Sequence, residues 1–149
     1  MRAVVTRVTH ASVAIDSKIA GEINSGLLVL IGFTDGDDET IVKRMAQKIS
    51  RLRIFEDSAG KMNLDILKKG GEVLSVPQFT LYADLSRGNR PSFFGAMDKE
   101  EAHHLYHFFN QCLETDYHIK VSKGKFGAHM DVSSINDGPV TILMDSSDF

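Results

Sequence analysis

Apolar and polar residues alternate along the beginning of the chain. Residues 3–8 follow the two-residue period of a half-buried strand, and residues 12–15 and 19–23 flank a short turn. Residues 27–33 form an apolar run, which predicts a central strand buried on both faces. We therefore expect the chain to begin with a β-sheet.

Helical spacing replaces this alternation in two later segments. The first follows the acidic residues 37–39, and its apolar positions are Ile41, Val42, Met45, Ile49 and Leu52. The second begins at Asp98, which has capping-box spacing to Glu101. Its apolar positions are Leu105, Phe108, Phe109, Cys112 and Leu113. Both segments are predicted to be amphipathic helices on the sheet.

Further strands are predicted at 72–79, 117–121, 130–135 and 140–144, and an exposed loop at 84–91. Strands outnumber helices and do not alternate strictly with them. This order favours one α+β domain spanning residues 1–149. We expect a layered β/β/α fold with a curved, barrel-like sheet and two main helices.

Composition narrows the class of protein. With 42% hydrophobic and 25% charged residues the chain is typical of a globular protein, and its longest apolar run, residues 26–33, is far shorter than the roughly 20 residues of a membrane helix. Residues 1–7 alternate and carry charge, so they predict a strand and no signal peptide. We expect a cytoplasmic protein with no membrane partner. The single cysteine, Cys112, excludes an internal disulfide and a Cys-rich zinc site.

The formal net charge of -3 argues against a protein that coats nucleic acid by neutralising phosphates, so no DNA partner is expected. Recognition of one RNA end remains compatible with it. Lys and Arg cluster locally, at 43–53, 68–69, 87–90 and 120–125, where solvated faces are the simplest interpretation. A non-catalytic nucleic-acid-binding module therefore stays an alternative.

Histidines on the second predicted helix raise the question of a metal. His103 and His107 share one helix face, as in some zinc enzymes, but the accompanying glutamate and a third ligand are missing. We expect a solvated polar face, no metal and no cofactor, and keep a metal-dependent hydrolase as an alternative. His129 and Asp131 form part of a catalytic triad only if a serine joins them, and no GxSxG elbow marks one.

Two short segments remain. SVPQFTLYAD, residues 75–84, places Pro77 at the end of an apolar strand, where proline donates no ladder hydrogen bond. The strand is therefore expected to be irregular or at an edge, with neighbouring amides free for a ligand, although a simple strand end also fits. NDGPVT, residues 136–141, has the chemistry of a tight turn between two strands.

Together these segments resemble the D-aminoacyl-tRNA deacylase family, and the similarity extends over the whole chain. The matching motifs are MRAVVTRV, MNLD, PQFTLYAD, RGNRPSF, FGAHM and NDGPVT. The resemblance implies a homodimer in which each active site receives Gly138 and Pro139 from the partner subunit, with the peptide bond between them cis. It also implies hydrolysis of D-aminoacyl-tRNA to free amino acid and tRNA.

Such an enzyme accepts D residues of many sizes and rejects L residues. Backbone atoms, and not a pocket shaped to one side chain, must therefore distinguish the two configurations. By the resemblance, the carbonyls of Gly138 and Pro139 point toward the α-amino group and into the space of an L side chain. Steric rejection discriminates more strongly than the roughly 1–3 kcal/mol of a missing methylene. Glycine has no side chain to clash, so glycyl-tRNA, such as glycine mischarged on tRNA-Ala, is expected to enter too.

The resemblance assigns a catalytic wall to Gln78, Phe79 and Thr80, where main-chain donors stabilise the oxyanion. Thr80 as a nucleophile needs an adjacent base, and none is evident, so a positioning role is expected. In the family the 2′-hydroxyl of the terminal adenosine is thought to assist water attack. Pro77 departs from the family's usual serine, and a related proofreading branch with a trans Gly–Pro bond and relaxed chirality has proline here. That branch stays an alternative.

Three further positions contact or support the substrate by the same resemblance. Phe126 and Met130 match residues that hold the terminal adenine, in keeping with the stacking of unpaired bases on aromatic rings. Arg7 matches the residue that supports the Gly–Pro turn. The expected partner is thus the 3′ terminal adenosine of an aminoacyl-tRNA.

Overall fold

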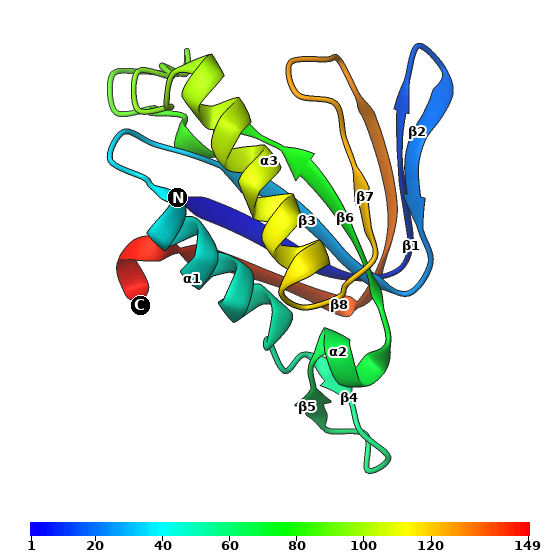
Figure 1. Ribbon diagram of the computed structural model, residues 1–149. Helices are drawn as coiled ribbons and strands as arrows, with labels where there is room; N and C mark the ends of the chain where they lie inside the picture. The colour runs from blue at the N-terminus through cyan, green and yellow to red at the C-terminus, as the bar shows by residue number, and fades with distance from the viewer.

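A curved β-sheet with two helices against one face makes up most of the chain (Figure 1). The computed structural model describes residues 1–149. Its strands are β1 (Arg2–Ile15), β2 (Lys18–Ile23), β3 (Gly26–Gly32), β4 (Phe55–Glu56), β5 (Met62–Leu64), β6 (Glu72–Pro77), β7 (Val121–Lys123) and β8 (Asp131–Asp145). Its helices are α1 (Glu39–Ser50), α2 (Ile66–Lys69) and α3 (Lys99–Thr115), with 3₁₀ turns η1 (Phe79–Tyr82) and η2 (Ser146–Asp148). None of the helices combines the length and the apolar sequence that crossing a membrane requires.

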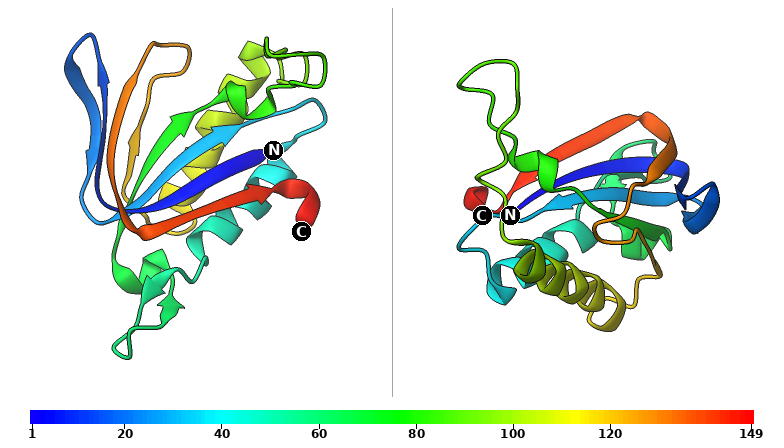
Figure 2. Two further views of the ribbon diagram at one scale, coloured as in Figure 1. Left: turned by 180° about the vertical axis from the view of Figure 1, so that it is seen from behind. Right: turned by 90° about the horizontal axis from the view of Figure 1, so that it is seen from above.

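Strand β1 organises the sheet, whose order is β2-β1-β3-β6-β7, with β8 paired to β1 alone. One edge of β1 pairs first with β3 and then with β2, while β8 follows the other edge from Arg2 to Ala14. The sheet therefore curls, as Figure 2 shows. The Ser122 hydroxyl on β7 donates to the Glu22 carbonyl on β2 at 2.8 Å, which nearly closes the curl.

Two hydrophobic cores fill the spaces on either side of the sheet. The larger lies between the sheet and helices α1 and α3, with Phe109, Met45, Ile49 and Leu113 among its fully buried side chains. The smaller is made by strands alone: Val8, Ala11, Val13, Ile23, Leu28, Leu74 and Val76. A strand-only core plus a strand–helix core gives two sheet layers and one helix layer. The predicted α+β, β/β/α fold is confirmed.

Both predicted helices form, and both begin at the expected caps. The Asp38 side chain accepts from the Ile41 amide at the start of α1, and the Asp98 side chain accepts from the Glu100 amide at the start of α3. Cys112 is buried in the apolar face of α3, and this burial raises the pKa of its thiol. A buried, protonated thiol is a core residue.

Four strand predictions need correction. Runs 3–8 and 12–15 are one strand, β1, and runs 130–135 and 140–144 are likewise one strand, β8. The strand expected at 117–121 begins only at Val121, because the Ile119 amide returns to the Leu113 carbonyl of α3 at 3.0 Å and His118 has a positive φ. The strand expected to reach Phe79 ends at Pro77.

Candidate active site

The main cavity, of about 560 Å³, lies where β3 and β6 end. One wall is the segment from β6 into η1, and the other is the start of α3 together with the loop between β7 and β8. Five of the predicted site residues line it, namely Pro77, Gln78, Phe79, Phe126 and Met130. Most of the other lining residues are hydrophobic, so the cavity suits the apolar surface of a base or side chain.

Pro77 ends β6 at a point where the sheet has no further neighbour. Strand β7 pairs with β6 only over Val73–Ser75, so the missing N–H of Pro77 leaves no ladder bond unmade there. The ladder to β3 instead continues through the Gln78 amide, which donates to the Ile31 carbonyl at 2.7 Å. Of the two expected placements, an irregular strand or an edge, Pro77 has the edge one, and the ladder to β3 is regular up to this residue.

Free amide donors follow at once in η1. Gln78 caps this turn without a side-chain hydrogen bond, so the N–H groups of Phe79 and Thr80 remain without an acceptor in the chain. The Gln78 side-chain amide donates to the Thr80 hydroxyl, which has no other hydrogen bond. Thr80 lies outside the cavity lining and has no base beside it. The turn thus offers backbone donors rather than an activated hydroxyl.

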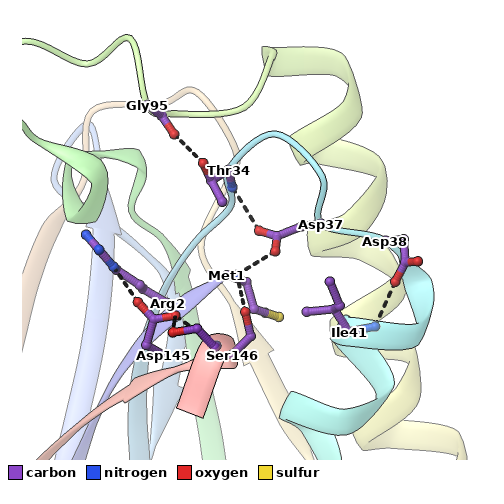
Figure 3. Close-up of polar contacts among 10 residues, drawn as sticks. Met1, Arg2, Thr34, Asp37, Asp38, Ile41, Gly95, Asp145 and Ser146 are labelled. Atoms are coloured by element: carbon purple, nitrogen blue, oxygen red, sulfur yellow. Dashed lines mark hydrogen bonds and ion pairs between the residues drawn. The ribbon is translucent and has the colours of Figure 1, made fainter. Parts of the chain in front are cut away.

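Arg2 fixes this turn from behind, a role that nothing in the sequence pattern indicated. Its Nη1 donates to the Leu81 carbonyl at 3.0 Å, and its guanidinium lies 4.6 Å from the centroid of the Tyr82 ring. Its Nε donates to the Asp145 carboxylate at 2.8 Å (Figure 3). That hydrogen bond lowers the pKa of Asp145 to about 2. Arg2 therefore connects β1 to β8 by an ion pair and to η1 by a hydrogen bond.

Phe126 forms the opposite wall against α3. Its ring centroid lies 5.1 Å from that of His103 and 6.0 Å from that of Tyr106. The Tyr106 hydroxyl donates to the Ser75 carbonyl at 2.9 Å, so the wall is tied to β6, and burial raises the pKa of this hydroxyl. Phe126 therefore presents a supported ring to the cavity.

The helix histidines are solvent-exposed, as predicted for a polar face. His104 Nε2 lies 3.2 Å from the Glu39 carboxylate, whereas His103 faces Phe126. No group of three or more His, Cys, Asp or Glu side chains is arranged to hold a metal ion. His103 therefore packs against Phe126, and His104 lies beside a carboxylate.

The predicted tight turn at NDGPVT is wrong. Strand β8 runs through this segment, and pairing with β1 places Asn136 opposite Val8 and Thr141 opposite Thr6. Residues 137–140 therefore bulge out opposite the single residue Arg7. Turn chemistry was a poor guide because the flanking runs pair with β1 and not with each other.

Gly138 and Pro139 lie exposed at the tip of this bulge. The peptide bond between them is cis, as the resemblance implies, and Gly138 has a φ of 127°. A Cβ on Gly138 would lie 2.8 Å from Val140 Cγ2 and 3.1 Å from the Arg7 guanidinium. Glycine is therefore required both by the backbone conformation and by the space.

Arg7 holds the bulge from below. Its side chain is only 6% exposed, and it donates to the Asp137 carbonyl at 3.1 Å and to the Ile54 carbonyl at 2.6 Å. The Asn136 side chain braces the same bulge by accepting from the Val140 amide at 3.0 Å. These contacts fix the direction in which the tip points.

The two predicted halves of the site do not meet within one chain. Arg7, Gly138 and Pro139 are absent from the cavity lining, which contains Phe126, Met130 and the Pro77–Phe79 segment. The lining also includes Lys99 and His129, which sequence reasoning missed as site residues. Lys99 is the only Lys or Arg among the lining residues, and no carboxylate lies within ion-pair distance of it.

Comparison with known proteins is consistent along the whole chain. The family model described as D-Tyr-tRNA(Tyr) deacylase matches residues 4–145. A D-aminoacyl-tRNA deacylase of Deinococcus radiodurans is 50% identical over 145 residues, 97% of this chain and 99% of the relative. One of Listeria innocua is 49% identical over 148 residues, 99% and 98% of the two chains.

Two solved structures share the fold. One, named "c-Myc DNA Unwinding Element Binding Protein", superposes with a TM-score of 0.93 at 41% identity and covers 97% of this chain and 98% of that one. The other is described as "a probable eukaryotic D-amino acid tRNA deacylase". It gives a TM-score of 0.82 at 17% identity, covers 96% and 97%, and supports the fold alone.

Proposed function

Because the chain belongs to the D-Tyr-tRNA(Tyr) deacylase family and is a D-aminoacyl-tRNA deacylase, a hydrolase, we propose that two copies of it share each active site. In this proposal the cavity of one subunit receives the aminoacyl end of tRNA. The Gly138–Pro139 tip of the other subunit closes the cavity. Free amino acid and tRNA are the products.

The proposal rests on the separation of the cavity from the Gly138–Pro139 tip within one chain. The cavity is concave and largely apolar, whereas the Gly138–Pro139 tip is convex, exposed and absent from the cavity of its own chain. Strand β8, which carries the tip, is a sheet edge with exposed Val132, Ile135 and Leu143. Exposed apolar side chains on an unpaired edge favour contact with a second subunit.

The chemistry follows from the two walls. The terminal adenine stacks on Phe126 beside Met130, which brings the ester carbonyl to η1. A water oxygen attacks the carbonyl carbon, and the amides of Phe79 and Thr80 stabilise the resulting oxyanion. The bond to the ribose oxygen then breaks, and that oxygen takes the proton. Thr80 positions the substrate, and the 2′-hydroxyl of the terminal adenosine assists the water.

In this proposal the bulge at Gly138 and Pro139 selects the configuration of the aminoacyl group. The carbonyls of Gly138 and Pro139 accept from the substrate α-amino group and occupy the space of an L side chain, so L esters are rejected. Glycyl-tRNA, including glycine on tRNA-Ala, passes because it has no side chain. Pro77 supplies neither the hydroxyl nor the amide of the family's usual serine. A relaxed chiral rule is therefore the competing outcome within the same family.

Parallel hydrolysis assays test the proposal. tRNA charged with D-tyrosine, L-tyrosine or glycine is incubated with the protein, and remaining ester is followed over time. We expect rapid loss of the D and glycyl esters and persistence of the L ester. Equal rates for D and L would assign the chain to the relaxed branch.

Treatment with EDTA tests the metal-dependent alternative. EDTA is expected to leave the hydrolysis rates unchanged. Loss of activity with EDTA and its recovery with zinc would instead support a metal-dependent hydrolase.

A nucleic-acid-binding module without catalysis is the second candidate. It is favoured by the 41% identity to a structure named as a DNA unwinding element binding protein. The net charge of -3 and the lack of an extended basic segment count against it. Tight binding of single-stranded DNA without hydrolysis of any charged tRNA would decide for this candidate.

A further inference from the structure

The loop between η1 and α3 stands beside the mouth of the cavity. It leaves the turn that carries Phe79 and returns at Ala96 and Met97, which both line the cavity. Its base is closed by two backbone hydrogen bonds between Asp84 and Ser92, at 2.8 and 2.9 Å. Figure 1 shows it in green beside the start of α3. Both ends of this loop are therefore parts of the cavity rim.

Two side-chain contacts fix the loop to that rim. The Phe93 ring meets the Phe79 ring edge-on, with centroids 5.0 Å apart. The Thr34 hydroxyl donates to the Gly95 carbonyl at 2.7 Å, and the Thr34 amide donates to Asp37 (Figure 3). Asp37 in turn pairs with the buried ammonium group of Met1 at 2.5 Å. The loop thus has a defined position relative to the cavity.

The loop carries an exposed aromatic ring and two exposed arginines. The Phe94 side chain is 98% exposed, although such a ring is normally buried. Arg87 and Arg90 are exposed, and neither has a carboxylate within ion-pair distance. Lys99, at the cavity itself, is also unpaired. An exposed aromatic ring on the same loop as two unpaired cations is a combination that suits the binding of single-stranded nucleic acid.

We propose that this loop and Lys99 form the binding track for the unpaired 3′ end of tRNA. Lys99 binds the phosphate of the terminal adenosine, because the ester and adenine occupy the cavity that Lys99 lines. Phe94 stacks on a base further along the strand, and Arg87 and Arg90 contact the phosphates beyond it. The inference rests on the proposed function, since it names how the same substrate is held.

Kinetics on two substrates test the track. One substrate is D-tyrosyl-tRNA, and the other is the D-tyrosyl ester of adenosine, which has no phosphate and no second base. Arg87→Ala/Arg90→Ala and Phe94→Ala are each expected to raise KM for the tRNA substrate about tenfold with little change in kcat. Phe94→Tyr is expected to keep the wild-type KM. The Arg87→Ala/Arg90→Ala and Phe94→Ala variants should both hydrolyse the adenosine ester at the wild-type rate.

Lys99→Gln is tested by adding a 5′-phosphate to the adenosine ester. We expect this phosphate to lower KM for the wild type and to have no effect on the variant. The salt dependence gives a second readout, because each lost phosphate contact lowers the slope of log KM against log salt by about 0.7. Lys68→Ala/Lys69→Ala, on exposed α2 far from the loop in Figure 1, is the matched control.

Unchanged KM for the tRNA substrate in the loop variants would overturn the inference. Equal losses on both substrates would overturn it as well, because they would show damage to the cavity rather than loss of strand contacts. Either result would leave the proposed function intact as long as the wild-type protein hydrolyses D-tyrosyl-tRNA. Failure of the wild type to do so would instead overturn the proposed function.

Discussion

The cavity and the Gly138–Pro139 bulge are built in opposite ways. The cavity is formed by side chains from four segments distant in sequence, and aromatic contacts and Arg2 hold its walls. The bulge is one short segment whose backbone is exposed and whose direction is set by the buried Arg7 together with the Asn136 side chain. Side chains suit the binding of an adenosine common to all substrates. Backbone atoms suit a filter that must ignore side-chain size.

This contrast predicts where substitutions act. Changes in the cavity are expected to weaken binding of every substrate alike, because the adenosine is invariant. Changes in the bulge are expected to act on catalysis and chirality, because in the proposed function only the aminoacyl group contacts the bulge.

Gly138→Ala is expected to have the largest effect. The new Cβ would lie 2.8 Å from Val140 Cγ2 on a backbone with a φ of 127°, so the tip must move. A displacement of about 1 Å near reacting groups lowers the rate on the order of 100-fold. Steady-state hydrolysis of D-tyrosyl-tRNA measures it. Gly60→Ala is the matched control, since Gly60 also has a positive φ but open space around it.

Mixing two inactive variants tests whether each active site is built from one chain or from two. Gly138→Ala destroys the tip, and Phe126→Glu blocks the cavity. If each site combines a cavity with a partner's tip, unfolding and refolding the two together restores about a quarter of wild-type activity, because half of the dimers are mixed and each has one intact site. No recovery would place the tip and the cavity of one site in the same chain.

Phe126→Leu tests the role of the cavity. Loss of the stacked ring is expected to raise KM about tenfold for D-tyrosyl-tRNA and glycyl-tRNA alike, since base stacking contributes about 1–3 kcal/mol. The ratio of D to L hydrolysis should stay constant. Met130→Leu, which keeps an apolar side chain of similar volume, serves as the control. A change in chiral ratio for Phe126→Leu would contradict the division of roles.

The two regions also differed in how far the sequence predicted them. Helices α1 and α3 followed from apolar spacing and from the acidic residues at their starts, and the edge position of Pro77 followed from its missing N–H, because these signals are local. The bulge was misread as a turn, because the partner of β8 is β1, more than a hundred residues away in sequence. Lys99 and Arg2 were missed for the same reason: only the fold brings Lys99 to the cavity and Arg2 to the turn η1.

A fall in pH is expected to have the smallest effect. It acts on the ion pair between Arg2 and Asp145, which lies behind the turn η1. The lowered pKa of Asp145, about 2 against an ordinary value near 4, means that the ion pair stabilises the fold above pH 4 and is lost as the pH falls through about 2. Both side chains are partly exposed, so the contribution is about 1 kcal/mol or less.

Asp145→Asn therefore lowers the free energy of unfolding at pH 7 by about 1 kcal/mol or less, and the difference from wild type shrinks between pH 4 and 2. Urea unfolding at pH 7, 4 and 2.5 measures the difference, with Asp148→Asn as the exposed control. Because Arg2 also binds the Leu81 carbonyl, the variant should lose some activity at pH 7 while its chiral ratio stays constant. A shifted ratio would mean that the cavity wall, and not the bulge alone, takes part in chiral selection.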